Sequence, residues 1–362
     1  MVQKRQRITM TPYPSRLNDP SPDSLALLGW SGYEEALDAV FRQFTASTGF
    51  KVAFVGCRNQ DEMLHTARSA AGAGGFFDVA CPTTDRLSSW IKEGLLQAWD
   101  EKSIHFDQIE GRFAADAHTV RNGKRMGSPN LWGSAALGYR GDSVAIDPQR
   151  ASLMDLFDEA YAGKLMLRED TAFVAAGRAL ESAGRLPHPF ADSYRDEVRM
   201  VANYDVILQF LRTKRHNVSR FWFSEQAAQQ AFRTGACAIG YVWDTTVAAL
   251  QEEGMPIRFA ATVEGAACYI QNFVLLAGAR NFTAANAWVA WVNTAQGGAR
   301  YAQAFRAFSP VKGASALMDA GQRRFLEKSY PSSALNRLWW QPEQEPWFVK
   351  RREAYAHAFL AP

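Results

Sequence analysis

The hydrophobic pattern in the first third of the chain alternates between two periods. Short apolar runs at residues 25–29, 51–57 and 77–81 have the length and alternation of buried strands. The segments between these runs, at 33–49 and 60–70, place apolar side chains three and four residues apart, which is the spacing of an amphipathic helix. This order of strands and helices predicts a parallel sheet with helices on both faces.

A passage of small residues at 127–140 separates this series from a second one. We predict a strand there, long enough to leave one domain and enter another. A strand at 269–277 then returns the chain to the first domain, and a crossing near Ser309 and Pro310 takes the tail back to the second. The remaining predicted elements are a helix at 151–160, a strand at 164–167, a helix from 171, helices at 204–214 and 224–234, a strand at 237–243, and helices at 245–253 and 283–295.

The length of 362 residues exceeds the size at which a single hydrophobic core keeps growing. We therefore predict a loosely ordered N-terminal segment at 1–23, a first lobe of 24–134 plus 270–309, and a second lobe of 135–269 plus 310–362. Two lobes joined by strands form a hinge, and such lobes close around a ligand.

Composition narrows the class of protein. Hydrophobic residues make up 47% and charged residues 21%, as in ordinary soluble proteins, and the net charge of +3 is not concentrated in one run. We therefore expect no nucleic-acid partner. No segment approaches the ~20 apolar residues of a membrane helix, so we expect no membrane insertion. The four cysteines lack metal-binding spacing, and we expect buried thiols, no metal and no cofactor, with a Cys237–Cys268 disulfide left open.

Trp30 and Tyr33 lie in the turn after the first predicted strand. In an open α/β sheet, ligands bind beyond the carboxyl ends of the strands. The electron-rich faces of the two rings suit a small organic cation. The alternative is that Trp30 closes the end of the sheet as part of the core.

Further motifs follow this turn in a fixed order along the chain. They are Pro-Thr-Thr at 82–84, IKEGLL at 91–96, NLWGSAALGY at 130–139, YAGKLMLRED at 161–170, TGACAIGYVW at 234–243, the Glu-Gly of VEGAACYIQN at 263–272, and Trp-Trp-Gln at 339–341. Together the motifs resemble the spermidine/putrescine-binding group of the periplasmic solute-binding proteins of ABC importers, over residues 25–348. The resemblance implies a two-lobed periplasmic-binding-protein fold of type II, in which each lobe is a mixed, mostly parallel sheet flanked by helices.

The resemblance also implies a role. It implies a monomeric, non-enzymatic protein of the periplasm, although no export signal is visible in the sequence, with ABC permease subunits as partners. The ligand is expected in the cleft between the lobes, its methylenes between aromatic rings and its ammonium groups on carboxylates. The expected ligand contacts, with their immediate neighbours, are Trp30, Ser31, Tyr33, Thr83, Thr84, Asp85, Trp132, Asp170, Trp243, Asp244, Tyr269, Gln271 and Gln341. Trp132 and Trp222 are also candidates for core packing.

The chain departs from the family pattern at the carboxylates. Phe173 replaces the second carboxylate of the 170 region, and Gln271 stands where another is expected. A diamine needs a negative partner at each end, because a desolvated ammonium without one costs several kcal/mol. Asp170 supplies one partner, and Asp85 and Asp244 are the substitutes for the other.

Polyamine capture is therefore the first expectation for function, with putrescine or spermidine as ligand. The alternative is an amine-containing zwitterion, such as an opine or an aminophosphonate, whose amine binds Asp170. Its anion would bind the helix start at Thr83 and Thr84, aided by Arg168. The preferred interpretation of Arg168 is, however, a solvent-facing strand end. A cleft enzyme is remote, since the sequence contains none of the common hydrolase or nucleotide-binding motifs. A scaffold protein without transport would not need the aromatic residues.

Overall fold

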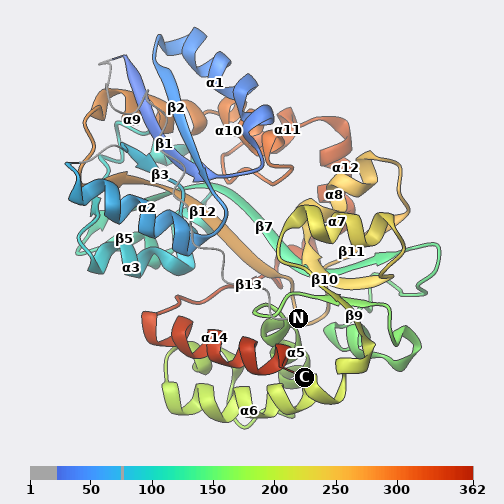
Figure 1. The fold of residues 1–362 in the computed structure, drawn as a ribbon. Coiled ribbons are helices and arrows are strands. Elements are labelled where there is room, and N and C mark those ends of the chain that lie inside the picture. Colours follow the sequence, from blue (N-terminus) through green and yellow to red (C-terminus); the bar gives the residue numbers. More distant parts are fainter. Residues whose placement is uncertain (1–22, 75–76, 362) are drawn as a thin grey trace.

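The computed structural model describes residues 23–74 and 77–361 of the chain. The N-terminal segment predicted at 1–23 therefore lies, apart from Asp23, outside the described residues, as does any export signal there. Two lobes are visible, with two long strands passing between them (Figure 1). The predicted lobe boundaries are not tested by this arrangement and stay a prediction.

One sheet runs through both lobes. Its main path has the order β2 (Lys51–Cys57), β1 (Ser24–Trp30), β3 (Val79–Ala80), β12 (Ala267–Leu276), β7 (Gly127–Arg140), β10 (Ile239–Trp243), β8 (Leu165–Leu167) and β9 (Val218–Phe221). Strands β1, β2 and β3 are parallel, as are β8, β9 and β10. The antiparallel pair of β7 and β12 joins the two parallel groups. Off this path, β4 (Leu96–Gln97), β11 (Ile257–Ala260) and β13 (Trp339–Trp340) pair with β12 or β7, and β5 (Val120–Arg121) pairs with β6 (Lys124–Arg125).

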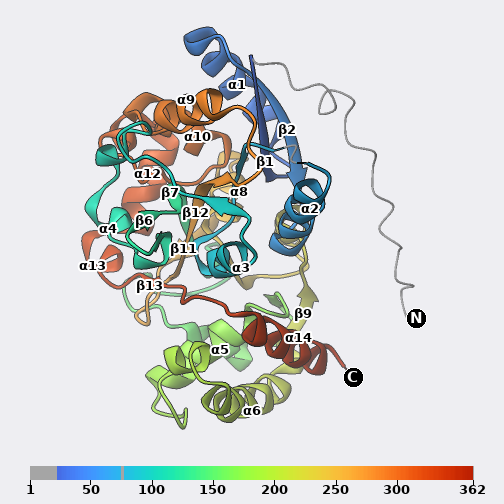
Figure 2. The ribbon, with the colours of Figure 1, turned by 90° about the vertical axis from the view of Figure 1, so that its left-hand side faces the viewer.

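Helices cover the sheet in each lobe (Figures 1 and 2). In the first lobe they are α1 (Glu34–Thr48), α2 (Gln60–Gly72), α3 (Leu87–Lys92), α4 (Gly111–Ala114), α9 (Phe282–Val292) and α10 (Ala295–Ala304). Those after β7 and in the tail are α5 (Ala172–Ser182), α6 (Glu197–Thr213), α7 (Glu225–Arg233), α8 (Asp244–Glu252), α11 (Ala314–Leu317), α12 (Ala320–Ser329), α13 (Ser332–Leu335) and α14 (Pro346–Leu360).

Helix α1 shows how the sequence pattern determines this packing. Leu37, Val40 and Phe44 recur on one face and are buried. The helix ends at Gly49, whose φ of 82° lies in the left-handed region that glycine adopts without strain. Phe44 contacts the buried Trp288 of α9 edge to face, with ring centroids 5.0 Å apart. The pairing of an early and a late helix closes the first lobe.

Most predicted elements are present, and the differences have local causes. The predicted helix at 151–160 is instead two 3-10 turns, Leu153–Phe157 and Glu159–Tyr161, started by the side chains of Ser152 and Asp158. The helix predicted at 204–214 begins earlier, at Glu197, because the Asp196 carboxylate accepts hydrogen bonds from its first amides.

The helix predicted at 283–295 ends at Val292 and a second helix, α10, begins at Ala295. Thr294 caps this second helix by accepting a hydrogen bond from the Gly297 amide. The four cysteines are buried free thiols, as expected, and burial raises the pKa of Cys237 to about 12. Across the described residues, we find no helix with the length and apolarity to span a membrane.

The loop before β12 depends on Gly265. Its φ is +89°, and a Cβ at this position would lie 1.9 Å from the Arg337 carbonyl oxygen, just before β13. Gly123 also has a positive φ, +72°, but a Cβ there would meet no atom within 4 Å.

We expect Gly265→Ala to lower the free energy of unfolding by ~3 kcal/mol or more, since it combines a strained φ with a displaced backbone carbonyl. Gly123→Ala is the matched control, and should cost ~1 kcal/mol for its φ alone. Urea unfolding measures both losses. Equal losses in the two variants would show that the close approach of β13 does not constrain this loop.

Candidate functional site

The predicted ligand residues lie where strands of both lobes end. Trp30 is the last residue of β1, and Thr83 follows β3. In the other lobe, Arg168 directly follows β8 and Trp243 ends β10. The carboxyl ends of the two parallel groups thus supply side chains from both lobes, which is the usual place for a ligand in an α/β fold.

The first turn reaches across to the second lobe. The hydroxyl of Tyr33 donates a hydrogen bond to Glu225 Oε2 at 2.6 Å, and Glu225 is the first residue of α7. Trp30 stays partly exposed while its Nε1 donates to the Cys81 carbonyl oxygen at 3.1 Å, which fixes the plane of the indole. The bond between Tyr33 and Glu225 shows the lobes in contact at this edge of the cleft.

A group of side-chain amides lies beside this turn. Gln60 Nε2 donates to Thr83 Oγ1 at 2.9 Å, and Thr83 forms an isolated bridge with Gln271 of β12. The oxygens Gln60 Oε1 and Gln271 Oε1 are both buried and accept no hydrogen bond from any described residue. The first lobe therefore presents two amide acceptors that lack donors.

The second lobe presents a guanidinium between indole rings. The Cζ of Arg168 lies 5.5 Å from the ring centroid of Trp243 and 5.5 Å from that of Trp222, within the range of cation–π attraction. Trp222 is buried and donates its Nε1 to the Tyr241 carbonyl oxygen at 3.3 Å. The preferred interpretation of Arg168 as a solvent-facing strand end does not match this position, because the side chain is three-quarters covered.

Arg168 also pairs with Asp170, the carboxylate that was expected to bind an amine of the ligand. Its Nε lies 3.0 Å from Asp170 Oδ1, and that oxygen accepts the Thr171 amide at 2.8 Å. The contact is an ion pair by distance, but its angle leaves the buried Arg168 Nε without a hydrogen-bond acceptor among the described residues. Asp170 is thus already neutralised by a neighbour two residues away.

A second arginine reaches Asp170 from α14. Arg352 Nη1 donates to Gln344 Oε1 at 2.6 Å, and Gln344 Nε2 donates to Asp85 Oδ2 at 2.7 Å. Burial lowers the pKa of the Arg352 guanidinium, but the charges of Asp170 and other neighbours outweigh this and raise it overall. Its buried Nε has no acceptor within the described part of the chain. Asp85, with its pKa raised by burial, is bound by Gln344 and joins the two lobes.

Asp244, the first residue of α8, is enclosed by other residues of the protein. Its carboxylate is buried and accepts hydrogen bonds from the Ser134 amide at 2.9 Å, the Thr245 amide at 2.9 Å and the Tyr330 hydroxyl at 2.6 Å. Burial is the main cause that raises the pKa of Asp244 to about 7, and these donors moderate it. Tyr269 lies against it over Gly133, where an added Cβ would be 2.4 Å from the Tyr269 hydroxyl.

Three other residues that were predicted to contact the ligand instead pack against or hydrogen-bond to neighbouring residues of the protein. Trp132 is buried, with its ring 4.9 Å from Phe308 and 5.6 Å from Tyr330, so the structure places it in the core. The Thr84 hydroxyl accepts a hydrogen bond from Asn272 Nδ2 at 2.7 Å and is buried. Ser31 is half-buried, and its amide donates to the Cys57 carbonyl oxygen at 3.0 Å.

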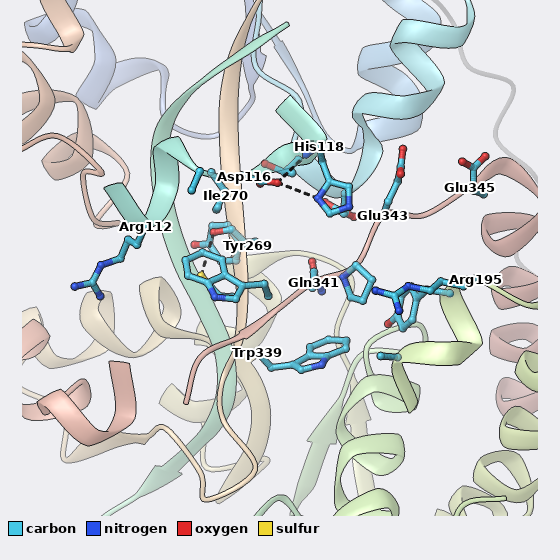
Figure 3. A pocket seen from close by; sticks show the side chains of 18 of the residues that line it. Arg112, Asp116, His118, Arg195, Tyr269, Ile270, Trp339, Gln341, Glu343 and Glu345 are labelled. Carbon is cyan, nitrogen blue, oxygen red and sulfur yellow. Dashed lines mark hydrogen bonds and ion pairs between the residues drawn. The ribbon is translucent and has the colours of Figure 1, made fainter. Parts of the chain in front are cut away.

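A cavity of about 630 Å³ lies beside this group at the edge of β12 (Figure 3). Thr84, Asp85, Tyr269 and Gln341 line it, so it includes four of the predicted contacts. Among the described residues, no cluster of three or more His, Cys, Asp or Glu side chains could hold a metal ion. The arrangement is therefore suited to a small organic ligand.

Sequence reasoning missed Gln60, Glu225 and Arg352. Glu225 lies three residues after Trp222 and begins a helix, a place where acidic residues are common for helix stability alone. Gln60 is the first residue of α2, next to the capping residue Asn59, so its position has a local explanation too. Arg352 lies in a C-terminal helix for which no element was predicted. Only the tertiary structure brings these three side chains to the cleft.

The comparison with known proteins identifies the family. A family model described as bacterial extracellular solute-binding protein matches residues 39–324. The chain belongs to this family. The predicted resemblance to spermidine/putrescine-binding proteins is confirmed, and so is the two-lobed periplasmic-binding-protein fold.

Three similar proteins illustrate the range of the family. The spermidine/putrescine-binding periplasmic protein of Escherichia coli (strain K12) is 25% identical over 261 residues, which are 72% of this chain and 69% of that protein. A spermidine/putrescine ABC transporter substrate-binding protein from Streptococcus pneumoniae has a TM-score of 0.76 at 17% identity, covering 93% of this chain and 98% of its own. The Atu4243–GABA receptor has a TM-score of 0.69 at 20% identity, covering 93% and 97%.

Members of this solute-binding family bind small molecules, act with ABC transporter permeases and are not enzymes. The general role of this chain as an ABC substrate-binding protein follows from its membership. Asp244 is buried beside Tyr269 and is held by residues of the protein itself.

The buried carboxylate of Asp244 leads us to predict how the stability of the protein depends on pH. An unfolded aspartate has a pKa of about 3.9, and the folded value is about 7. The folded state therefore holds this proton more tightly, so the contribution of Asp244 to stability is largest below pH ~4 and falls until pH ~7. Relative to the unmodified protein, the Asp244→Asn variant should become more stable as the pH rises from ~4 to ~7. Above pH ~7, the difference in the free energy of unfolding between the two proteins should stay constant.

Thermal unfolding at intervals from pH 4 to pH 8 measures this difference. Asp142→Asn is the control, because Asp142 is exposed and its pKa is lowered by Arg140, the opposite direction. Parallel curves for Asp244→Asn and the unmodified protein would contradict the raised pKa.

Proposed function

We propose that this substrate-binding protein captures a small zwitterion, with an ammonium and a carboxylate, between its two lobes for an ABC importer of the periplasm. The observation that carries the proposal is the set of buried polar atoms without partners. In the second lobe, Arg168 Nε and Arg352 Nε are donors without acceptors, and Glu169 Oε2 beside them is an acceptor without a donor. In the first lobe, Gln60 Oε1 and Gln271 Oε1 are acceptors without donors.

The two kinds of unmatched group call for two kinds of ligand chemistry. A buried polar group without a partner costs about 1–3 kcal/mol, more if charged, so a ligand that supplies the missing partners binds favourably. A carboxylate supplies acceptors for the guanidinium of Arg168. An ammonium supplies donors for the amide oxygens of Gln60 and Gln271 and lies on the aromatic side with Trp30.

Charge supports the same assignment. Asp170 is paired with Arg168 at 3.0 Å, and the charge of Asp170 acts on Arg352 as well. The carboxylates of Glu169 and Asp85 also interact with these guanidiniums, so this part of the cleft holds charges of both signs. Because Arg168 already pairs with Asp170, a ligand ammonium at Asp170 has to compete with Arg168, whereas a ligand carboxylate can accept a hydrogen bond from the buried Arg168 Nε.

Closure follows from the placement of these groups in both lobes. A ligand that reaches Arg168 and Gln271 together binds the closed arrangement better than an open one, so it shifts the population toward closure. The hydrogen bond of Tyr33 to Glu225 adds to the closed state. The closed protein is the form that we propose docks on the permease.

Polyamine capture is the second candidate, and two observations favour it. Curated relatives at 23–25% identity bind spermidine and putrescine by name. Glu225 also brings a carboxylate to the aromatic side of the cleft, where it could receive one ammonium. This candidate needs a second free carboxylate. Asp85, Asp170 and Asp244 all have partners within the protein, whereas Glu169 Oε2 beside Asp170 has none among the described residues.

A pair of substitutions at the ion pair separates the two candidates. We expect Arg168→Ala to weaken binding of γ-aminobutyrate or a related zwitterion roughly ten- to hundredfold, the loss of one charge-assisted hydrogen bond. Because the same change frees Asp170, it should leave putrescine binding unchanged or improve it. Asp170→Asn should instead weaken only the polyamine.

Isothermal titration with a panel of zwitterions and polyamines measures these affinities. Arg199→Ala is the matched control, since Arg199 pairs with Asp192 on the exposed side of α6, and it should change neither affinity. Tight binding of putrescine that is lost in Asp170→Asn and kept in Arg168→Ala would overturn the zwitterion proposal in favour of the polyamine.

A further inference from the structure

The turn between β8 and α5 gathers buried polar atoms that lack partners. It comprises residues 168–171, which follow the last residue of β8 and precede the first residue of α5, and we call it the β8–α5 turn. Three of its side-chain atoms are buried and have no hydrogen-bond partner among the described residues: Arg168 Nε, Glu169 Oε2 and Thr171 Oγ1. Of these three atoms, the proposed ligand supplies a partner for Arg168 Nε alone.

Arg352 brings a second guanidinium to this turn. Its helix, α14, packs beside the start of α5 (Figures 1 and 2), where the ring centroid of Phe173 lies 6.0 Å from that of Tyr355. Arg352 Nη1 is used by Gln344, but the buried Nε has no acceptor in the described part of the chain. The charge of Asp170 acts on this guanidinium, as it does on Arg168. Two N–H donors, one from each arginine, are therefore left for an anionic group.

Glu169 supplies the opposite kind of group. An ionised carboxylate can only accept hydrogen bonds, and its Oε2 receives none from the described residues. Burial is the largest cause that raises the pKa of Glu169, the charge of Asp170 raises it too, and Arg168 and Arg352 lower it. A buried charged group without a hydrogen bond is costly, so a donor that carries a positive charge would be bound favourably here.

Thr171 adds a hydroxyl to the same turn. It directly precedes α5, a position where Thr side chains often accept a hydrogen bond from the first amides of the helix, but its hydroxyl caps none of them. The Thr171 amide donates to Asp170 Oδ1 at 2.8 Å. Because a hydroxyl both donates and accepts, Thr171 Oγ1 can receive an N–H group of a ligand. Glu169 and Thr171 thus provide two acceptors in the same four residues as the donor Arg168.

The head group of an α-amino acid matches this combination of donors and acceptors. Its carboxylate and its ammonium are attached to one carbon atom, so the protein groups that bind them have to lie side by side. When the carboxylate accepts from Arg168, the adjacent ammonium can donate to Glu169 Oε2. γ-Aminobutyrate carries its ammonium at the far end of the chain, so it would leave Glu169 Oε2 without a donor.

The formal charges around the β8–α5 turn favour the same head group. The two guanidiniums of Arg168 and Arg352 interact with three carboxylates, those of Glu169, Asp170 and Asp85. When all five groups are ionised, one negative charge is in excess. A ligand with one carboxylate and two ammoniums brings the opposite net charge, whereas γ-aminobutyrate brings none.

We propose that the β8–α5 turn binds the head group of an α-amino acid, whose carboxylate accepts from Arg168 and Arg352 and whose α-ammonium donates to Glu169. This inference rests on the proposed function, and it narrows the substrate class to diamino acids. The second ammonium, at the end of the side chain, binds the amide oxygens of Gln60 and Gln271 in the first lobe. Glu169 is then the residue that selects for the α-ammonium.

The test uses two pairs of ligands whose members differ only in the α-ammonium. One pair is γ-aminobutyrate and L-2,4-diaminobutyrate, and the other is δ-aminovalerate and L-ornithine. Isothermal titration gives the ratio of the two affinities within each pair for the unmodified chain, for Glu169→Gln and for Glu327→Gln. Glutamine keeps the size of glutamate and removes its charge. Glu327 is exposed on α12, so its substitution is the matched control.

In the pair that binds more tightly, the unmodified protein should bind the diamino acid at least about tenfold more tightly than its parent, as expected for one hydrogen bond between charged groups. Glu169→Gln should remove most of this advantage, because the α-ammonium then lacks its negative partner. Glu327→Gln should leave the ratio unchanged. The ratio separates recognition from folding, since a partly unfolded variant would lose affinity for both members of a pair equally.

Two results would overturn the inference while the proposed function stands. If the parent compounds bind and the diamino acids bind no better, the β8–α5 turn does not receive an α-ammonium. If the diamino acids bind better but Glu169→Gln keeps the full ratio, Glu169 is not the group that selects them. If no member of either pair binds and putrescine does, the zwitterion proposal itself is wrong, and this inference is wrong with it.

Discussion

The antiparallel pairing of β7 with β12 is the constraint on which the rest of the structure depends. These strands run through both lobes and join the parallel groups β1–β3 and β8–β10 into one sheet. Because side chains alternate along a strand, Tyr269 and Gln271 of β12 share one face, toward the cleft. The backbone amide of Ser134 in β7 donates a hydrogen bond to the Asp244 carboxylate. The same two strands thus join the lobes and carry some of the predicted ligand contacts.

The cleft combines two unlike halves, and this asymmetry determines what it can bind. One half has aromatic rings and amide oxygens, at Trp30, Gln60 and Gln271, and the other has the guanidiniums of Arg168 and Arg352. Each half holds buried groups that lack partners when the protein is alone. In the function that we propose, a ligand with one end of each sign satisfies both halves, and only when the lobes are together. Specificity and closure would then arise from the same unmatched atoms.

Much of the fold could be predicted from the sequence because the signals are local. The apolar run Lys51–Cys57 and the small-residue passage Gly127–Arg140 are strands with the predicted bounds. Gly127–Arg140 is buried along nearly its whole length, and Lys51–Cys57 is half-buried along most of its own. Elements governed by caps or by distant partners were predicted less well. Helix α6 begins where Asp196 caps it, and the short β13 exists only because it pairs with β12.

The chemistry of the site was less predictable because it depends on contacts between distant residues. The sequence indicates that Asp170 is near the cleft, but its pairing with Arg168 depends on how the chain turns after β8. Glu225 meets Tyr33 across 192 positions of sequence, and Arg352 reaches the cleft from the last helix. The resemblance to polyamine-binding proteins predicts the position of the site, and we propose that the ion pairs of this chain decide which ligand charge it prefers.

The most direct test of this account is a crystal structure of the protein with γ-aminobutyrate bound. The account predicts that the ligand carboxylate lies within hydrogen-bond distance of the Arg168 guanidinium, and that the ammonium lies beside Trp30 and the amide oxygens of Gln60 and Gln271. A ligand bound in the opposite direction, with its ammonium on Asp170 and its carboxylate away from Arg168, would contradict it.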